Sequence, residues 1–150
     1  MKVNKSLFIE SIVPGNLYYF KEDRLTATHE PHFFVVVGIK EKEFIIFMAG
    51  TSNFEKASRR IELRKQNFST LVRLKPDTNN ELTKETYIDC NNYFDHTFDE
   101  FFDMFKNDEV THKGYIEESK LYEIVTGSMA SDNLEGEIQD IIKASIKSLG

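Results

Sequence analysis

The chain has 150 residues, of which 40% are hydrophobic and 29% charged, and 13 are Phe. This composition is typical of a single globular domain with a substantial core. No apolar run approaches the length of a membrane-spanning helix, and Met1 to Ile12 has neither a long apolar stretch nor a small-residue cleavage site. The single cysteine, Cys90, excludes an internal disulfide framework and a cysteine-based metal site. A cytoplasmic protein without a membrane span or signal peptide is therefore expected.

Charge is distributed unevenly along the chain. The net charge is −6, yet residues 1–80 hold 13 Lys+Arg against 9 Asp+Glu, whereas residues 81–150 hold 6 against 16. The basic excess is concentrated in residues 55–75, whose seven cations are Lys56, Arg59, Arg60, Arg64, Lys65, Arg73 and Lys75. Such a stripe predicts local attraction of a polyanion. A solvated face, or an intramolecular partner for the acidic half, would explain it equally well.

Three apolar runs in the first third predict an antiparallel meander. The first, residues 17–20, is aromatic and follows a Pro-Gly-Asn turn. The second, residues 32–38, is almost continuously apolar, which predicts a strand buried on both faces. A charged hairpin turn, residues 40–43, leads into the third run, residues 44–48.

The rest of the chain predicts further strands and then helices. Phe residues recur at helical spacing from Phe94 to Phe105 with acidic residues between them, which predicts an amphipathic helix capped by Asp95 or Thr97. Apolar residues stepping by three or four predict a second amphipathic helix at the C-terminus. The expected strands are Ser58–Leu63, 71–74, 86–90 and 114–116, and the expected helices are 94–105, 118–125 and 134–149.

Together these elements predict an α+β fold that is mainly β: a small, partly open antiparallel barrel with peripheral helices. One domain is expected over residues 1–150. The C-terminal helix, at about 134–149, is expected to cover either its own core or that of a partner.

The order of the motifs resembles the MazF/PemK family of toxin endoribonucleases, which are small SH3-like barrels. Residues 14–20 resemble the family's glycine-polar-aromatic opening, and residues 33–37 its Val-rich strand. Thr51-Ser52 matches a Thr-Ser or Thr-Thr pair at the end of the next strand, and residues 114–124 resemble the late glycine strand and helix. The resemblance covers about residues 12–127. The family's Arg-Pro is here Pro31-His32, so the arginine is missing.

The resemblance implies a metal-independent endoribonuclease that cleaves single-stranded RNA, uses no cofactor, forms a homodimer and is neutralised by an antitoxin peptide. It implies that the missing cation is replaced by His32 or by an arginine of the next segment. The catalytic residues implied are His32, Thr51, Ser52 and Arg59, and the RNA-binding residues are Tyr18, Arg60, Arg64 and Lys65.

These residue types suit the reaction. A histidine near neutral pH serves as base or acid, hydroxyls donate to phosphate oxygens, and arginine binds a phosphate in bidentate fashion. Aromatic rings stack on unpaired bases, but Tyr18 and Tyr19 point to opposite faces of one strand, so at most one faces a groove.

Other interpretations stay open. A histidine next to a proline at a strand start, as His32 is, is more often a surface turn residue, and Thr51-Ser52 can satisfy backbone groups in a turn. His29 and His32 are too sparse for a metal site, so none is expected. Asp89 is either a general base or a structural residue, and Cys90 a core residue. The alternative functions are a non-catalytic barrel module that binds a peptide or anionic ligand, and a structural partner whose C-terminal helix docks on another chain.

Overall fold

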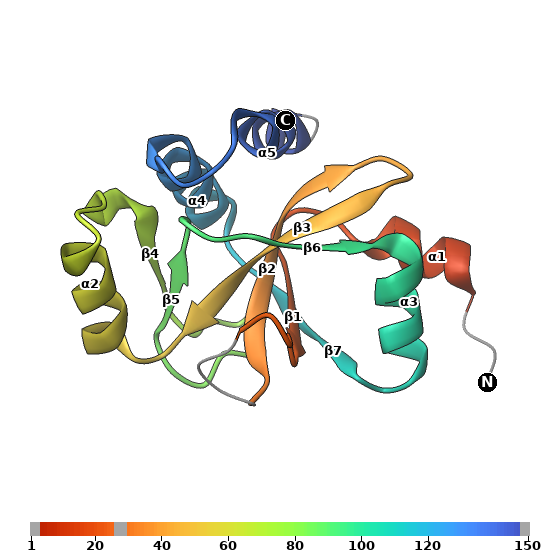
Figure 1. The fold of residues 1–150 in the computed structure, drawn as a ribbon. Coiled ribbons are helices and arrows are strands. Elements are labelled where there is room, and N and C mark those ends of the chain that lie inside the picture. The colour runs from red at the N-terminus through yellow and green to blue at the C-terminus, as the bar shows by residue number, and fades with distance from the viewer. Residues whose placement is uncertain (1–3, 26–29, 148–150) are drawn as a thin grey trace.

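The computed structural model describes residues 4–25 and 30–147 (Figure 1). Seven antiparallel strands form an open sheet, six of them in the order β4-β5-β3-β2-β1-β7. The seventh strand, β6, pairs with a different part of β3 from the part that pairs with β5. The predicted α+β class with a mainly antiparallel, partly open sheet is confirmed. The strands are β1 (Asn16–Phe20), β2 (His32–Lys40), β3 (Phe44–Thr51), β4 (Leu71–Leu74), β5 (Thr86–Asp89), β6 (Phe94–Thr97) and β7 (Val110–Tyr115). The helices are α1 (Lys5–Ser11), α2 (Phe54–Leu63), α3 (Phe98–Lys106), α4 (Glu118–Ala130) and α5 (Gly136–Lys147), with a 3-10 turn η1 (Phe68–Thr70).

The central strand β2 is buried on both of its faces, as its continuous apolar run predicts. Val35 and Val37 pack into one core cluster, whereas Phe34 and Val36 pack into another on the opposite face. Alternate side chains of a strand point to opposite faces, so helices must cover both sides of the sheet. In Figure 1, α4 and α5 lie over one face, and α1 and α3 pack together at the other end of the molecule.

The C-terminal helix α5 packs on the chain's own sheet. Ile138, Ile142 and Ile146 belong to the same core cluster as Val35 and Val37. The β2–β3 register shifts between Val36 and Gly38. Just past this bulge, Ser145 Oγ accepts the Ile39 N–H at 2.9 Å. This helix therefore covers its own core, which is one of the two alternatives that the sequence leaves open.

The second core cluster is mainly aromatic. Phe101 of α3 is fully buried and its ring lies 5.0 Å from that of Phe47 and 5.1 Å from that of Tyr18, measured between centroids. The aromatic face of α3 is thus core packing. Tyr18 is only 2% exposed within this cluster. Its predicted role in stacking RNA bases is therefore wrong, because neither ring face is accessible.

Two predicted elements are corrected by the structure. The strand expected at Ser58–Leu63 is the second half of α2, which buries Ala57 and Ile61 at helical spacing and leaves Leu63 exposed. The helix expected from Phe94 begins only at Phe98, because residues 94–97 pair with β3 as β6. Thr97 then caps α3 by accepting the Glu100 N–H at 3.1 Å.

The loop between β4 and β5 reaches across the opening of the sheet to β7. The Glu81 N–H donates to the Lys113 carbonyl at 3.0 Å, and the Tyr115 N–H donates to the Asn79 carbonyl at 3.1 Å. Gly114 adopts a φ of 84° between these contacts, a conformation that favours glycine. Within the described residues, no helix has the length and apolar character needed to cross a membrane.

Candidate functional site

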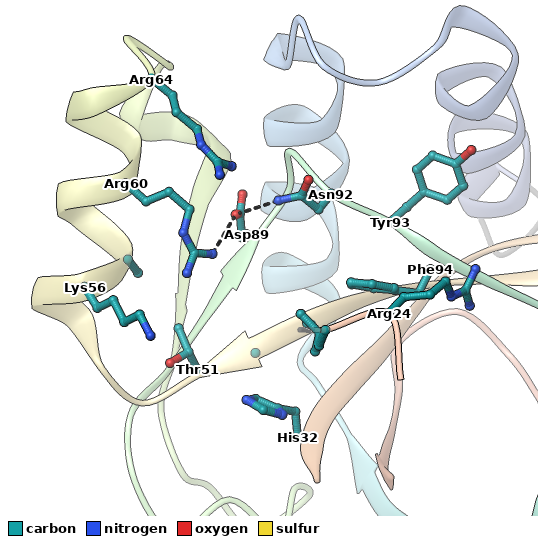
Figure 2. Close-up of a pocket in the computed structure, with 14 residues that line it drawn as sticks. Arg24, His32, Thr51, Lys56, Arg60, Arg64, Asp89, Asn92, Tyr93 and Phe94 are labelled. Atoms are coloured by element: carbon teal, nitrogen blue, oxygen red, sulfur yellow. Dashed lines mark hydrogen bonds and ion pairs between the residues drawn. The ribbon is translucent and has the colours of Figure 1, made fainter. Parts of the chain in front are cut away.

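A cavity of about 430 Å³ lies between α2 and the sheet (Figure 2). It takes residues from the ends of β2, β3 and β5, from α2, and from the segments after β1 and β5. The described lining residues are Arg24, Leu25, His32, Ala49, Gly50, Thr51, Lys56, Ala57, Arg60, Arg64, Asp89, Asn92, Tyr93 and Phe94. Four cations and one carboxylate make this a positively charged hollow in an acidic protein.

The pairing of β2 with β3 places His32 and Thr51 at the same end of these two strands. β2 and β3 are antiparallel with Phe34 opposite Ala49, so the start of β2 lies beside the end of β3. The sequence predicts this neighbourhood, and the structure confirms that both side chains line one cavity.

Hydrogen bonds leave each of these two side chains with one reactive atom. His32 Nδ1 lies 2.9 Å from the Glu30 carbonyl, which only accepts, so Nδ1 carries the hydrogen and Nε2 is the basic nitrogen of the neutral ring. Thr51 Oγ1 accepts the Asn53 N–H at 3.2 Å, which leaves the hydroxyl hydrogen to donate to a ligand.

Helix α2 and its C-cap residue Arg64 supply three of the four cations. Asn53 caps it by accepting the Lys56 N–H at 3.0 Å, and burial of Ala57 and Ile61 fixes its rotation against the sheet. Lys56, Arg60 and Arg64, spaced four residues apart, therefore share one face and line the cavity.

Three of the predicted site residues stand apart from this lining. Arg59 lies about 100° around the helix from Arg60, on the side away from the cavity. Ser52 and Lys65 are exposed and do not line the cavity. The structure therefore does not bring Arg59, Ser52 or Lys65 together with His32 in this cavity, and their predicted roles stay predictions. His29 lies outside the described residues.

Asp89 holds its neighbours in place at the cavity wall. Its carboxylate accepts from the Asn91 backbone N–H at 2.9 Å, from Asn91 Nδ2 at 3.0 Å and from Asn92 Nδ2 at 3.1 Å. Arg60 Nη1 lies 3.8 Å from Asp89 Oδ2, the oxygen that also accepts from Asn92 (Figure 2). With its lone pairs occupied in this way, Asp89 is a structural residue rather than a free general base. This outcome resolves the two interpretations that the sequence leaves open.

Arg24 reaches the cavity from the segment after β1, but its charge is largely neutralised. Its Nε donates to Glu22 Oε1 at 2.8 Å and its Nη1 to Asp95 Oδ1 at 2.9 Å. Its Nη2 donates to the Asp95 carbonyl at 2.7 Å. Two carboxylates thus surround one guanidinium, so Arg24 shapes the wall more than it attracts anions.

Glu22 is a buried carboxylate with two donors. His96 Nε2 lies 2.6 Å from Glu22 Oε2, the oxygen to which Arg24 Nη2 also donates at 3.2 Å, and the Glu22 side chain is 4% exposed. Burial alone would raise the pKa of Glu22, but the hydrogen bonds from Arg24 and His96 outweigh burial and hold that pKa below its usual value. The carboxylate therefore stays ionised and anchors Arg24.

Cys90 is buried beside the site and takes no part in it. Burial raises the pKa of its thiol well above the ordinary range, so the thiolate that a nucleophile requires does not form. The prediction that Cys90 is a core residue is confirmed.

No protein-family model matches the chain, and no curated protein matches it either. Function is therefore inferred from the cavity. Sequence reasoning missed Arg24, Lys56, Asn92 and Tyr93 as lining residues. Of these four, only Lys56 could have been found from the sequence. It precedes Arg60 by four residues and Arg64 by eight, which places all three on one face once the segment is taken as a helix.

Proposed function

We propose that the cavity binds the backbone of single-stranded RNA and that the chain is a metal-independent endoribonuclease of the toxin type. The observation that carries this proposal is the meeting of His32 and Thr51 with three cations of α2 in one hollow. The cations attract the phosphates, the hydroxyl donates to a phosphate oxygen, and the imidazole moves a proton.

The reaction needs no co-reactant. His32 Nε2 takes the proton of a ribose 2′-OH, and the 2′-oxygen forms a bond to the adjacent phosphorus. The bond from phosphorus to the 5′-oxygen breaks, that oxygen takes a proton from water, and His32 returns the proton it accepted to the solvent, so that protons and charge balance. The products are a 2′,3′-cyclic phosphate and a 5′-hydroxyl. Thr51 and the α2 cations stabilise the added charge on the phosphorane.

The partners of this proposal follow from the MazF/PemK resemblance. The chain would act in the cytoplasm as a homodimer and be neutralised by an antitoxin peptide. A peptide rich in Asp and Glu would complement the same cations and compete with RNA.

The second candidate is a non-catalytic module that binds an anionic ligand. One observation favours it: His32 is the single histidine in the described lining, whereas the reaction needs both a base and an acid. Binding without cleavage separates this candidate from the first.

The test is cleavage of a mixed-sequence single-stranded RNA in EDTA, with each protein purified in parallel. The wild type is expected to cleave. His32→Ala should lose about 100-fold or more of the rate, and Thr51→Val a similar factor of about 100. Ser52→Ala, one residue along but outside the cavity, is the matched control and should keep full activity.

Each result decides between the candidates. RNA binding without cleavage would select the non-catalytic module. Cleavage that survives both substitutions would place the active site elsewhere.

A further inference from the structure

We propose that the α2 ladder, defined as Lys56, Arg60 and Arg64, binds three consecutive phosphates of the RNA strand, with the cleaved phosphate at Lys56. This inference rests on the proposed function and adds to it a direction and a length for the bound strand.

The spacing of the ladder suits successive phosphates. Four residues of an α-helix rise about 6 Å, which is close to the separation of neighbouring phosphates in an extended single strand. The burial of Ala57 and Ile61 turns all three cations toward the cavity, and Figure 2 shows their side chains in a column along α2. A strand lying along the helix therefore meets one cation at each phosphate.

The ion pairs of the lining cations also distinguish the three ladder residues from Arg24. Arg24 is engaged with Glu22 and Asp95, and Arg60 has only the 3.8 Å approach of Asp89. No ion pair in the described part of the chain involves Lys56 or Arg64. The charge that remains to attract an anion thus lies on α2.

The position of the reactive groups gives the ladder a direction. Lys56 is in the first turn of α2, just after Thr51 at the end of β3, whereas Arg64 caps the far end of the helix. In Figure 2, His32 and Thr51 lie toward the Lys56 end of the cavity. The phosphate beside Lys56 is therefore the one attacked, and the two bound by Arg60 and Arg64 both lie on the same side of the cleaved bond.

The first experiment measures binding of a 2′-O-methyl RNA hexamer, which cannot be cleaved, by fluorescence anisotropy at several salt concentrations. The slope of log K against log[salt] falls by about 0.7 for each single-strand phosphate contact that is removed. Lys56→Gln, Arg60→Gln and Arg64→Gln should each reduce the slope by about this amount. Arg59→Gln, which removes the same charge from the same helix outside the cavity, should leave the slope unchanged.

The second experiment measures cleavage of short RNAs lengthened on one side of the cleaved bond at a time. The ladder predicts that kcat/KM rises with each of two phosphates added on one side and is unaffected by phosphates added on the other. A symmetrical length dependence, or a slope reduced equally by Arg59→Gln, would overturn the ladder while leaving an RNA-binding cavity in place. A wild type that binds no RNA would overturn the ladder and the proposed function together.

Discussion

Glu22→Gln should destabilise the protein by breaking the hydrogen bonds that Arg24 and His96 donate to one oxygen of a buried carboxylate. Arg24 donates to both oxygens of the Glu22 carboxylate, and His96 donates to Oε2. A glutamine keeps one acceptor oxygen and places an NH2 donor at the other position, so the contacts to one of the two oxygens are lost. A hydrogen bond to a charged group contributes about 1.5–3 kcal/mol, and we expect the lower end because the Arg24 side chain is 48% exposed and regains water.

A loss of about 1.5 kcal/mol corresponds to a decrease in Tm of about 3–6 °C for a chain of this size. Urea unfolding at pH 7 measures it. Glu100→Gln is the matched control: its carboxylate faces the same His96 ring at 3.4 Å but is largely exposed, so its effect should stay within about 0.5 kcal/mol.

The pH dependence of the stability of the same variant tests whether Glu22 is ionised in the folded chain. The pKa of Glu22 is lower in the folded chain than in the unfolded one. Its stabilising contribution is thus complete above the unfolded value, about 4.3, and is lost as pH falls through the folded pKa. The difference in the free energy of unfolding between wild type and Glu22→Gln should therefore become smaller below about pH 4. Equal stability at pH 7, or a difference that does not change with pH, would refute this reasoning.

Two further substitutions test the fold that holds the cavity. Phe101→Ala removes a fully buried ring from the aromatic cluster and should cost about 3–5 kcal/mol in the free energy of unfolding; a loss below about 1 kcal/mol would show that the cluster is loosely packed. Gly114→Ala places a methyl group against the Asn79 carbonyl at a φ of 84°, and should lower the Tm and loosen the contact between β7 and the β4–β5 loop. Hydrogen exchange at the Tyr115 N–H, which should become faster than in wild type, measures that contact; an unchanged rate would contradict it.

The sheet could be predicted because its apolar runs are unambiguous. A run such as Phe33 to Val37 is too short and too continuously apolar for a surface helix, and the strand predicted at 71–74 matches β4 (Leu71–Leu74). The wrong predictions of secondary structure arose where the same apolar residues fit both the two-residue period of a strand and the 3.6-residue period of a helix. Ile61 and Leu63 suit a strand, but the Asn53 cap and the pair Ala57 and Ile61 suit the helix that forms.

The aromatic segment after β5 shows the same ambiguity. Phe94 and Phe98 are four residues apart, as on one helix, yet Phe94 belongs to a strand paired with β3. Thr97 was the signal for the true helix start, since it caps α3.

Half of the site could be predicted from sequence, and the other half could not. His32 and Thr51 meet because antiparallel neighbours bring the start of one strand to the end of the next. The anchoring of Arg24 depends on Asp95, and that of its partner Glu22 on His96, each more than 70 residues away in sequence. Pairing over such a separation leaves no local pattern.

The most direct measurement is a crystal structure of the protein with a 2′-O-methyl RNA that spans the cavity. One phosphate should lie within hydrogen-bond distance of Thr51 Oγ1, near His32, with the next two beside Arg60 and Arg64. An RNA strand seated on any other surface, with the cavity unoccupied, would contradict the account.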